Sequence, residues 1–173
     1  SSLNQGAVKV IPFPWLAALN SQRTRLSLLN STPVKSPGER VTLVMPPDAF
    51  EQVESVAVTE LHGQNLPLPL PYGWSPLAAF HLDAPTESTS DIAARVKLTQ
   101  AVAPSQSLAL VRFDLTTIAW ITVSLHTSSG GDSLDVIFRK PGSYSVVLAD
   151  TLPTGNPVAV SYTHLTLPTK RIV

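Results

Sequence analysis

The tripeptide His-Leu-Thr at residues 164–166 has the residue types for nucleophilic chemistry. A threonine hydroxyl becomes a useful nucleophile when a neighbouring base removes its proton. The stretch that begins at His81 has the same spacing but carries a carboxylate, Asp83, where the hydroxyl would have to be. We therefore expect His81 to be a strand histidine without a catalytic role.

The two remaining histidines and a pair of aspartates lack the spacing of a metal site. His62 and His126 flank separate turns, and neither has a carboxylate at metal-ligand spacing. Asp132 and Asp135, next to a Gly-Gly pair, could contact calcium, but two carboxylates fall short of the roughly six to eight oxygen ligands that calcium takes. We predict no metal site and place both aspartates on a solvated hairpin.

Three tryptophans could form platforms for sugars. Trp120 lies in an apolar strand-like stretch, so we expect it to be buried, with a partner for its indole N–H. We expect Trp74 to cover one end of the fold and only Trp15, in a proline-rich stretch, to be exposed. A single exposed tryptophan supports sugar binding poorly, and no serine lies in a G-x-S-x-G elbow. No catalytic or cofactor-binding residue is predicted.

Composition excludes several functional classes. Lys+Arg and Asp+Glu are balanced at 12 each, so no overall field draws the chain to nucleic acid. The absence of cysteine excludes a disulfide framework, a thiolate metal site and a cysteine nucleophile. No apolar run reaches the ~18 residues of a membrane span. We expect no nucleic-acid partner, no membrane insertion and no cofactor.

The elements that would position these residues are short strands. Charged residues make up only 14% of the chain and there are 16 prolines, a mix typical of strands joined by turns. The strand-like segments are "RVTLVMP", "SVAVTEL", "PLAAFHLD", "ARVKLTQ", "SLALVRFD", "IAWITV", "LDVIF" and "YSVVLAD". Their number and spacing predict an all-β fold, an antiparallel β-sandwich of the ZU5 or immunoglobulin type, in one domain.

Alternation within these segments predicts which side chains face the core. Val41, Leu43 and Met45 share one face of their strand, and Val96 and Leu98 share one face of theirs.

Two turns connect the later strands. We expect residues 114–117 to form the turn of a hairpin that ends in "IAWITV", a strand that is apolar on both faces and therefore predicted to be central. Gly130-Gly131 marks the next turn.

The N-terminal region allows two interpretations. Residues 1–38 are either edge strands of the same sandwich or the end of a preceding domain followed by the linker "NSTPVKSPGE", and we favour edge strands. The ordered module is expected over residues 39–150, followed by a disordered tail over 151–173.

Three stretches, in this order, resemble ZU5-like modules. "VTLVMPPDAF" runs into a Pro-Pro turn, "LPYGWSPLAAFHL" opens a later strand with Ser-Pro, and "LALVRFDLTTIAWITV" is a penultimate hairpin that ends in a tryptophan. The match covers residues 41–150, with Asp48 where that family often has glycine. The resemblance implies a module of large bacterial secreted or surface proteins, including those with YD/Rhs-type repeats.

Some ZU5 and GAIN domains cleave themselves at a His-Leu/Phe-Ser/Thr site, so the resemblance implies Thr166 as nucleophile and His164 as base. However, "VSYTHLTLPT" is similar to the in-frame translation of an adapter used in sequencing libraries. We therefore expect residues 160–173 to be foreign to the fold and the tripeptide to be inert.

The sequence thus predicts a non-catalytic structural or interaction module of a larger bacterial protein, with neighbouring domains of the same polypeptide as partners. Two alternatives remain open, a carbohydrate- or ligand-binding β-sandwich and a self-cleaving module. We expect an extracellular or cell-surface location. Because the chain begins with serine, we also expect it to be a piece of a longer reading frame, in which a missing signal peptide is uninformative.

Overall fold

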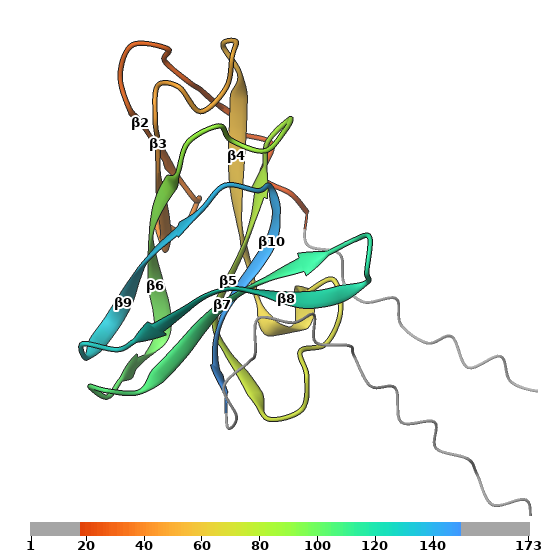
Figure 1. The fold of residues 1–173 in the computed structure, drawn as a ribbon, viewed down its shortest axis with the longest axis vertical. Helices are drawn as coiled ribbons and strands as arrows, with labels where there is room; N and C mark the ends of the chain where they lie inside the picture. The colour runs from red at the N-terminus through yellow and green to blue at the C-terminus, as the bar shows by residue number, and fades with distance from the viewer. Residues whose placement is uncertain (1–17, 150–173) are drawn as a thin grey trace, which may run out of the picture.

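The computed structural model describes residues 18–149, which form two antiparallel sheets packed against each other (Figure 1). The predicted all-β sandwich is confirmed. The six-stranded sheet has the order β1 (Thr24–Arg25), β4 (Ser55–Leu61), β5 (Trp74–Asp83), β10 (Gly142–Ala149), β7 (Ser107–Asp114) and β8 (Ala119–Thr127). The four-stranded sheet has the order β2 (Thr32–Lys35), β3 (Val41–Met45), β6 (Ile92–Val102) and β9 (Gly131–Phe138). A 3-10 turn, Gly63–Asn65, precedes β5.

Alternating side chains from both sheets fill the space between them. Val41, Leu43 and Met45 of β3 are buried, as are Val96 and Leu98 of β6, which confirms the predicted inward faces. A strand that buries every second residue against a second sheet removes a continuous apolar surface from water, and this burial is the main favourable term in folding. The main core therefore follows directly from the period-2 pattern.

Three aromatic rings lie at the centre of this core. Phe80 of β5 stacks on Tyr144 of β10 with ring centroids 5.2 Å apart, and Phe138 of β9 tilts against Tyr144 at 4.5 Å. The hydroxyl of Tyr144 donates to the carbonyl oxygen of Lys140 at 2.6 Å. Burial raises the pKa of Tyr144 far above its ordinary value, so the phenol stays neutral and keeps donating.

A second apolar cluster lies on the opposite face of the six-stranded sheet. Leu108 and Leu110 of β7 point into the main core, whereas the alternate residues Ala109 and Val111 belong to the second cluster. Its other buried members are Leu61, Leu66, Ala79, Phe113, Trp120 and Val147. Residues 62–73, here called the cover, contribute leucines to this cluster and close it from outside. The six-stranded sheet is thus apolar on both faces over part of its area.

The N-terminal part of the described chain provides two edge strands. β1 pairs with β4 at one edge of the larger sheet, and β2 pairs with β3 at one edge of the smaller one. β2 lies within the stretch that the sequence also allowed as a linker. It contains Pro33, which lacks an N–H and is tolerated in an edge strand.

Two expectations about the later strands were wrong. β8 was predicted to be central, but it is an edge strand of the six-stranded sheet. Its start is apolar on both sides because the second cluster, rather than another strand, covers its outer face.

The turn at Gly130-Gly131 does not close a hairpin either. β8 and β9 belong to different sheets, and φ angles of +93° and +108° at the two glycines allow the chain to cross between them. The two aspartates of β9 therefore lie on an edge strand paired with β6 rather than on a hairpin.

Candidate functional site

The β7–β8 hairpin extends beyond the body of the sandwich, with its tip at the right of Figure 1. The last strand pair is Asp114 with Ala119, which leaves a four-residue loop of sequence Leu-Thr-Thr-Ile over 115–118. The predicted turn is therefore present. Its tip is exposed and apolar at both ends, since residues Leu115 and Ile118 are 82% and 64% exposed.

Asp114 fixes the shape of this loop. Its Oδ2 accepts hydrogen bonds from the backbone N–H of Thr117 at 3.0 Å and from the Thr117 hydroxyl at 2.8 Å. Its Oδ1 accepts from Nη2 of Arg112 at 3.1 Å. These bonds, first from Thr117 and then from Arg112, hold the pKa of Asp114 below its ordinary value, because they favour the ionised carboxylate.

Ile118 adopts a left-handed backbone conformation, with φ = +50°. The last position of such a loop commonly requires a positive φ, which glycine and asparagine adopt at little cost. A β-branched side chain there is strained, because its Cβ comes too close to the following carbonyl. The strain is not offset by burial, since most of the isoleucine side chain faces solvent.

A hollow of about 330 Å³ lies beside the hairpin, here called the hairpin pocket. Its lining residues are Pro67, His81, Arg112, Phe113, Asp114, Leu115, Thr116, Pro141, Gly142 and Ser143. Three segments meet in it: the cover, the β5–β10 strand pair and the hairpin tip. Polar and apolar groups therefore converge on one space.

The polar groups of the pocket are already hydrogen-bonded to one another. Nδ1 of His81 lies 2.9 Å from the hydroxyl oxygen of Ser143, because the register of β5 and β10 places these residues opposite each other. Nη1 of Arg112 donates to the carbonyl oxygen of Phe113 at 3.3 Å. Burial lowers the pKa of His81, and the nearby carboxylate of Asp83 opposes this effect in part. At neutral pH the imidazole is therefore largely uncharged.

This arrangement favours binding over hydrolysis. An efficient serine–histidine pair needs a third group that orients the imidazole. The carboxylate of Asp83 is instead bonded to the guanidinium of Arg23. What the pocket offers is a set of fixed donors and acceptors beside apolar walls, the usual composition of a ligand site.

The other residues that the sequence singled out lie apart from this pocket. His62 is exposed before the 3-10 turn, and Nε2 of His126 in β8 lies 2.7 Å from the hydroxyl of Ser124. Asp132 is exposed in β9, while Asp135 accepts two hydrogen bonds of 2.8 Å from Arg95. Across residues 18–149, no group of three or more histidines, aspartates or glutamates could hold a metal ion.

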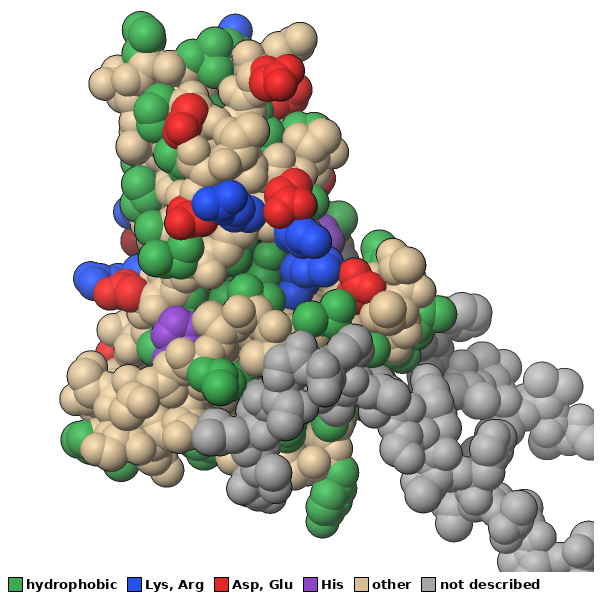
Figure 2. Space-filling view, in the orientation of Figure 1, with side chains coloured by type: hydrophobic (Ala, Val, Ile, Leu, Met, Phe, Trp, Pro, Cys, Tyr) green, Lys and Arg blue, Asp and Glu red, His purple; other side chains and the backbone are tan. Residues whose placement is uncertain are grey.

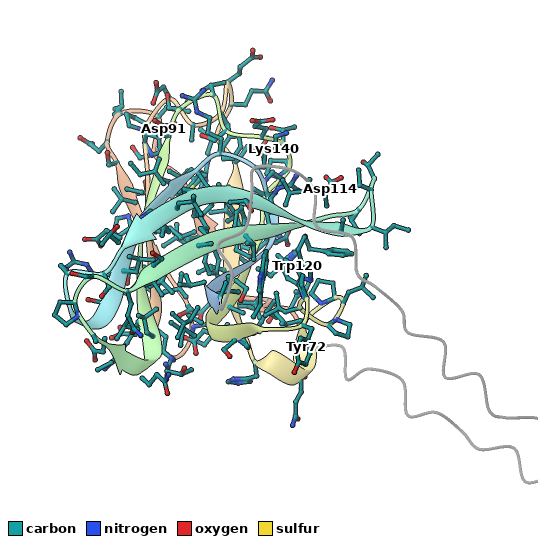
Figure 3. The ribbon with its side chains drawn as sticks, turned by 60° about the horizontal axis from the view of Figure 1, so that its bottom comes forward. Tyr72, Asp91, Asp114, Trp120 and Lys140 are labelled. Atoms are coloured by element: carbon teal, nitrogen blue, oxygen red, sulfur yellow. The ribbon has the colours of Figure 1, made fainter. Side chains whose placement is uncertain are left out.

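The tryptophans are packing residues where the structure describes them. Trp120 is completely buried, and its Nε1 donates to the carbonyl oxygen of Pro69 in the cover at 3.2 Å, as predicted (Figure 3). Trp74 packs against the second cluster. Trp15 and the 164–166 tripeptide lie outside the described residues.

Sequence reasoning found the Asp114 turn but missed four residues of the site, Arg112, Leu115, Ile118 and Ser143. The loop itself carried a signal, because an isoleucine stands where a hairpin favours glycine or asparagine. The sequence around Ser143 carried no such signal. His81 and Ser143 are 62 residues apart in the chain and are brought together only by the pairing of β5 with β10.

Charges on the described surface are mixed rather than segregated. Lys and Arg side chains lie next to Asp and Glu side chains across the middle of the face shown in Figure 2. Exposed ion pairs such as Arg95–Asp135 and Arg139–Asp91 join opposite charges on the described surface. Within residues 18–149, no helix is long and apolar enough to cross a membrane.

The chain matches no protein-family model and no curated protein sequence.

Proposed function

We propose that this domain is a non-catalytic interaction module of a larger bacterial secreted or surface protein, and that it contacts neighbouring domains through the hairpin tip. Placement in such a protein is supported by the resemblance of residues 41–150 to ZU5-like modules. The contact site is supported by the geometry of the tip.

The observation that carries this proposal is the exposed, strained Ile118. A left-handed conformation costs such a residue on the order of 1–2 kcal/mol, and the exposed side chain recovers little of it by packing within the domain. Leu115 adds a second exposed apolar side chain at the other end of the same loop. An apolar pair on a projecting loop, held rigidly by Asp114, gains its stabilising contacts when a partner covers it.

The experiment compares hydrogen–deuterium exchange of this chain alone with exchange of the longer polypeptide that contains it. We expect residues 113–119 to be protected in the longer polypeptide, because a docked neighbour would slow the opening of the loop. The turn at residues 36–40 serves as the internal control. Equal exchange of residues 113–119 in both proteins would rule out docking through the tip.

A second candidate function is favoured by the hairpin pocket. Fixed polar groups of Arg112, His81 and Ser143 lie next to the apolar side chains of Phe113 and Leu115, an arrangement suited to a small polar ligand such as a sugar. Glycan-array binding that is lost in Ser143→Trp, which fills the pocket, would favour this function. Ser133→Trp, exposed on β9, is the matched control.

A further inference from the structure

A small hollow lies between the two sheets, where β4 ends and β6 continues past the first residue of β3. It is here called the inter-sheet hollow. Its walls come from the start of β3 and the middle of β6 on one side, and from the end of β4 and the middle of β5 on the other. Its volume is about 60 Å³, and one ordered water needs roughly 10–15 Å³ of such space, so an ion of about five heavy atoms fits.

Three basic side chains from different segments line this hollow. Arg40 directly precedes β3, His62 directly follows β4, and Lys97 lies in β6. The backbone N–H of Lys97 donates to the carbonyl oxygen of Arg40 at 2.7 Å, and Nη2 of Arg40 donates to the carbonyl oxygen of Lys97 at 3.5 Å. These two bonds hold two positively charged residues next to each other at the rim of the hollow.

Neither of these two cations forms an ion pair within the part of the chain that the structure describes. The carboxylate that lines the hollow belongs to Glu60, whose Oε1 already accepts from the hydroxyl of Ser36 and from the backbone N–H of Arg40. The neighbouring Glu39 is paired with Lys35 at 3.1 Å. Two cations therefore face one carboxylate, and the hollow keeps a net positive charge at neutral pH.

We infer that the inter-sheet hollow binds a phosphate group through Arg40, Lys97 and His62. Guanidinium and ammonium groups can only donate, and both bond most strongly to negatively charged oxygens. The hydroxyl of Thr99, which also lines the hollow, adds a further donor. A tetrahedral phosphate presents four oxygens to donors that come from several directions, whereas a carboxylate presents two oxygens in one plane. The number and spread of the donors therefore favour phosphate.

This inference goes beyond the proposed function and uses other residues. The inter-sheet hollow and the hairpin pocket have no lining residue in common, and the hairpin tip is not part of the hollow. Docking through the tip and phosphate binding can therefore occur together. Leu115→Ser changes the tip and should leave phosphate binding unaltered, so the failure of one proposal can be distinguished from the failure of the other.

The test is an NMR titration of the full chain with inorganic phosphate, in which sodium chloride keeps the ionic strength constant. We expect saturable shifts of the backbone amide signals of residues 40, 62, 97 and 99. Acetate, titrated in the same way, should bind more weakly than phosphate. Signals that do not move or do not saturate with phosphate would overturn the inference, and so would acetate binding as tight as phosphate binding.

Variants assign the binding to the hollow. Arg40→Gln should weaken phosphate binding at least about tenfold, because it removes charge-assisted hydrogen bonds while the backbone bond to β6 remains. Arg25→Gln, the same change of charge at an exposed position of β1, is the matched control and should bind like the wild type. If Arg40→Gln fails to fold, Lys97→Gln, at an exposed position of β6, serves in its place. Unchanged affinity in these variants, or an equal loss in Arg25→Gln, would overturn binding in the hollow.

Discussion

At the scale of single residues, the strained left-handed backbone of Ile118 lowers the stability of the isolated domain. Replacing it by asparagine, which tolerates a left-handed backbone, should raise the free energy of unfolding by about 1 kcal/mol. Urea denaturation measures this change, with Leu115→Asn in the same loop as the control without positive φ. A lower stability for Ile118→Asn would show that the isoleucine stabilises the isolated domain and is not reserved for a partner.

Trp120 represents the opposite case, a residue whose whole side chain serves the fold. It is completely buried, contacts Phe113 edge-on at 5.5 Å and bonds to the cover through its indole N–H. Trp120→Ala should therefore lower the free energy of unfolding by about 3–5 kcal/mol. Tyr72→Ala, at an exposed position of the cover, should change it by less than about 0.5 kcal/mol. Similar losses in the two variants would exclude a structural role specific to Trp120.

At the scale of elements, one glutamate ties the two sheets together. Oε1 of Glu60 in β4 accepts from the buried hydroxyl of Ser36 and, at 3.1 Å, from the backbone N–H of Arg40, so it holds the turn between β2 and β3. Gly38 approaches so closely that an added Cβ would lie 2.7 Å from Oε2 of that carboxylate. The turn accepts the carboxylate because residue 38 has no side chain.

This contact predicts an energetic coupling. Gly38→Ala should destabilise the domain by about 1 kcal/mol, because the methyl group displaces the carboxylate from its donors. In a Glu60→Ala background the same change should have little effect, since the carboxylate is gone. A double-mutant cycle by urea denaturation measures the difference. Additive effects of the two substitutions would show that Glu60 does not hold the turn.

How far the sequence predicts these elements depends on the range of the interactions involved. Alternation such as Val41-Leu43-Met45 is local, and it predicted strands and inward faces correctly. The position of β8 at an edge was missed, because a strand covered by residues 62–73 has the same apolar pattern as one covered by another strand. A Gly-Gly turn likewise serves a hairpin and a crossing between sheets equally well. The hairpin pocket depends on strand register, which no local pattern encodes.

At the scale of the whole molecule, two partly buried histidines make stability depend on pH. Burial lowers the pKa of both His81 and His126 below 6.5, so the unfolded chain binds protons more readily than the folded one. The corresponding stability is complete above pH 6.5 and is lost as the pH falls through the lower pKa values of the folded state. The lowered pKa values of Asp114 and Asp135 act in a separate window, below about pH 3.8.

The urea concentration at the midpoint of unfolding should therefore decrease as the pH is lowered from 7.5 to 5.5. The double variant His81→Gln, His126→Gln should lose this dependence, because glutamine can hydrogen-bond to the serine partners without titrating. His62→Gln, at an exposed position, is the matched control and should keep it. A double variant with the wild-type slope would assign the pH dependence to other groups.

The cover over the second cluster allows the molecule to unfold in two ways, locally at the cover or globally. Its prolines, Pro67, Pro69 and Pro71, have no N–H to donate to a strand, so leucine packing and the bond from Trp120 hold it in place. Such a segment can detach at a smaller free-energy cost than global unfolding, leaving both sheets paired. A protease would therefore cut the cover while both sheets are still intact. The β7–β8 hairpin would then lose its packing against the cover long before the main core opened.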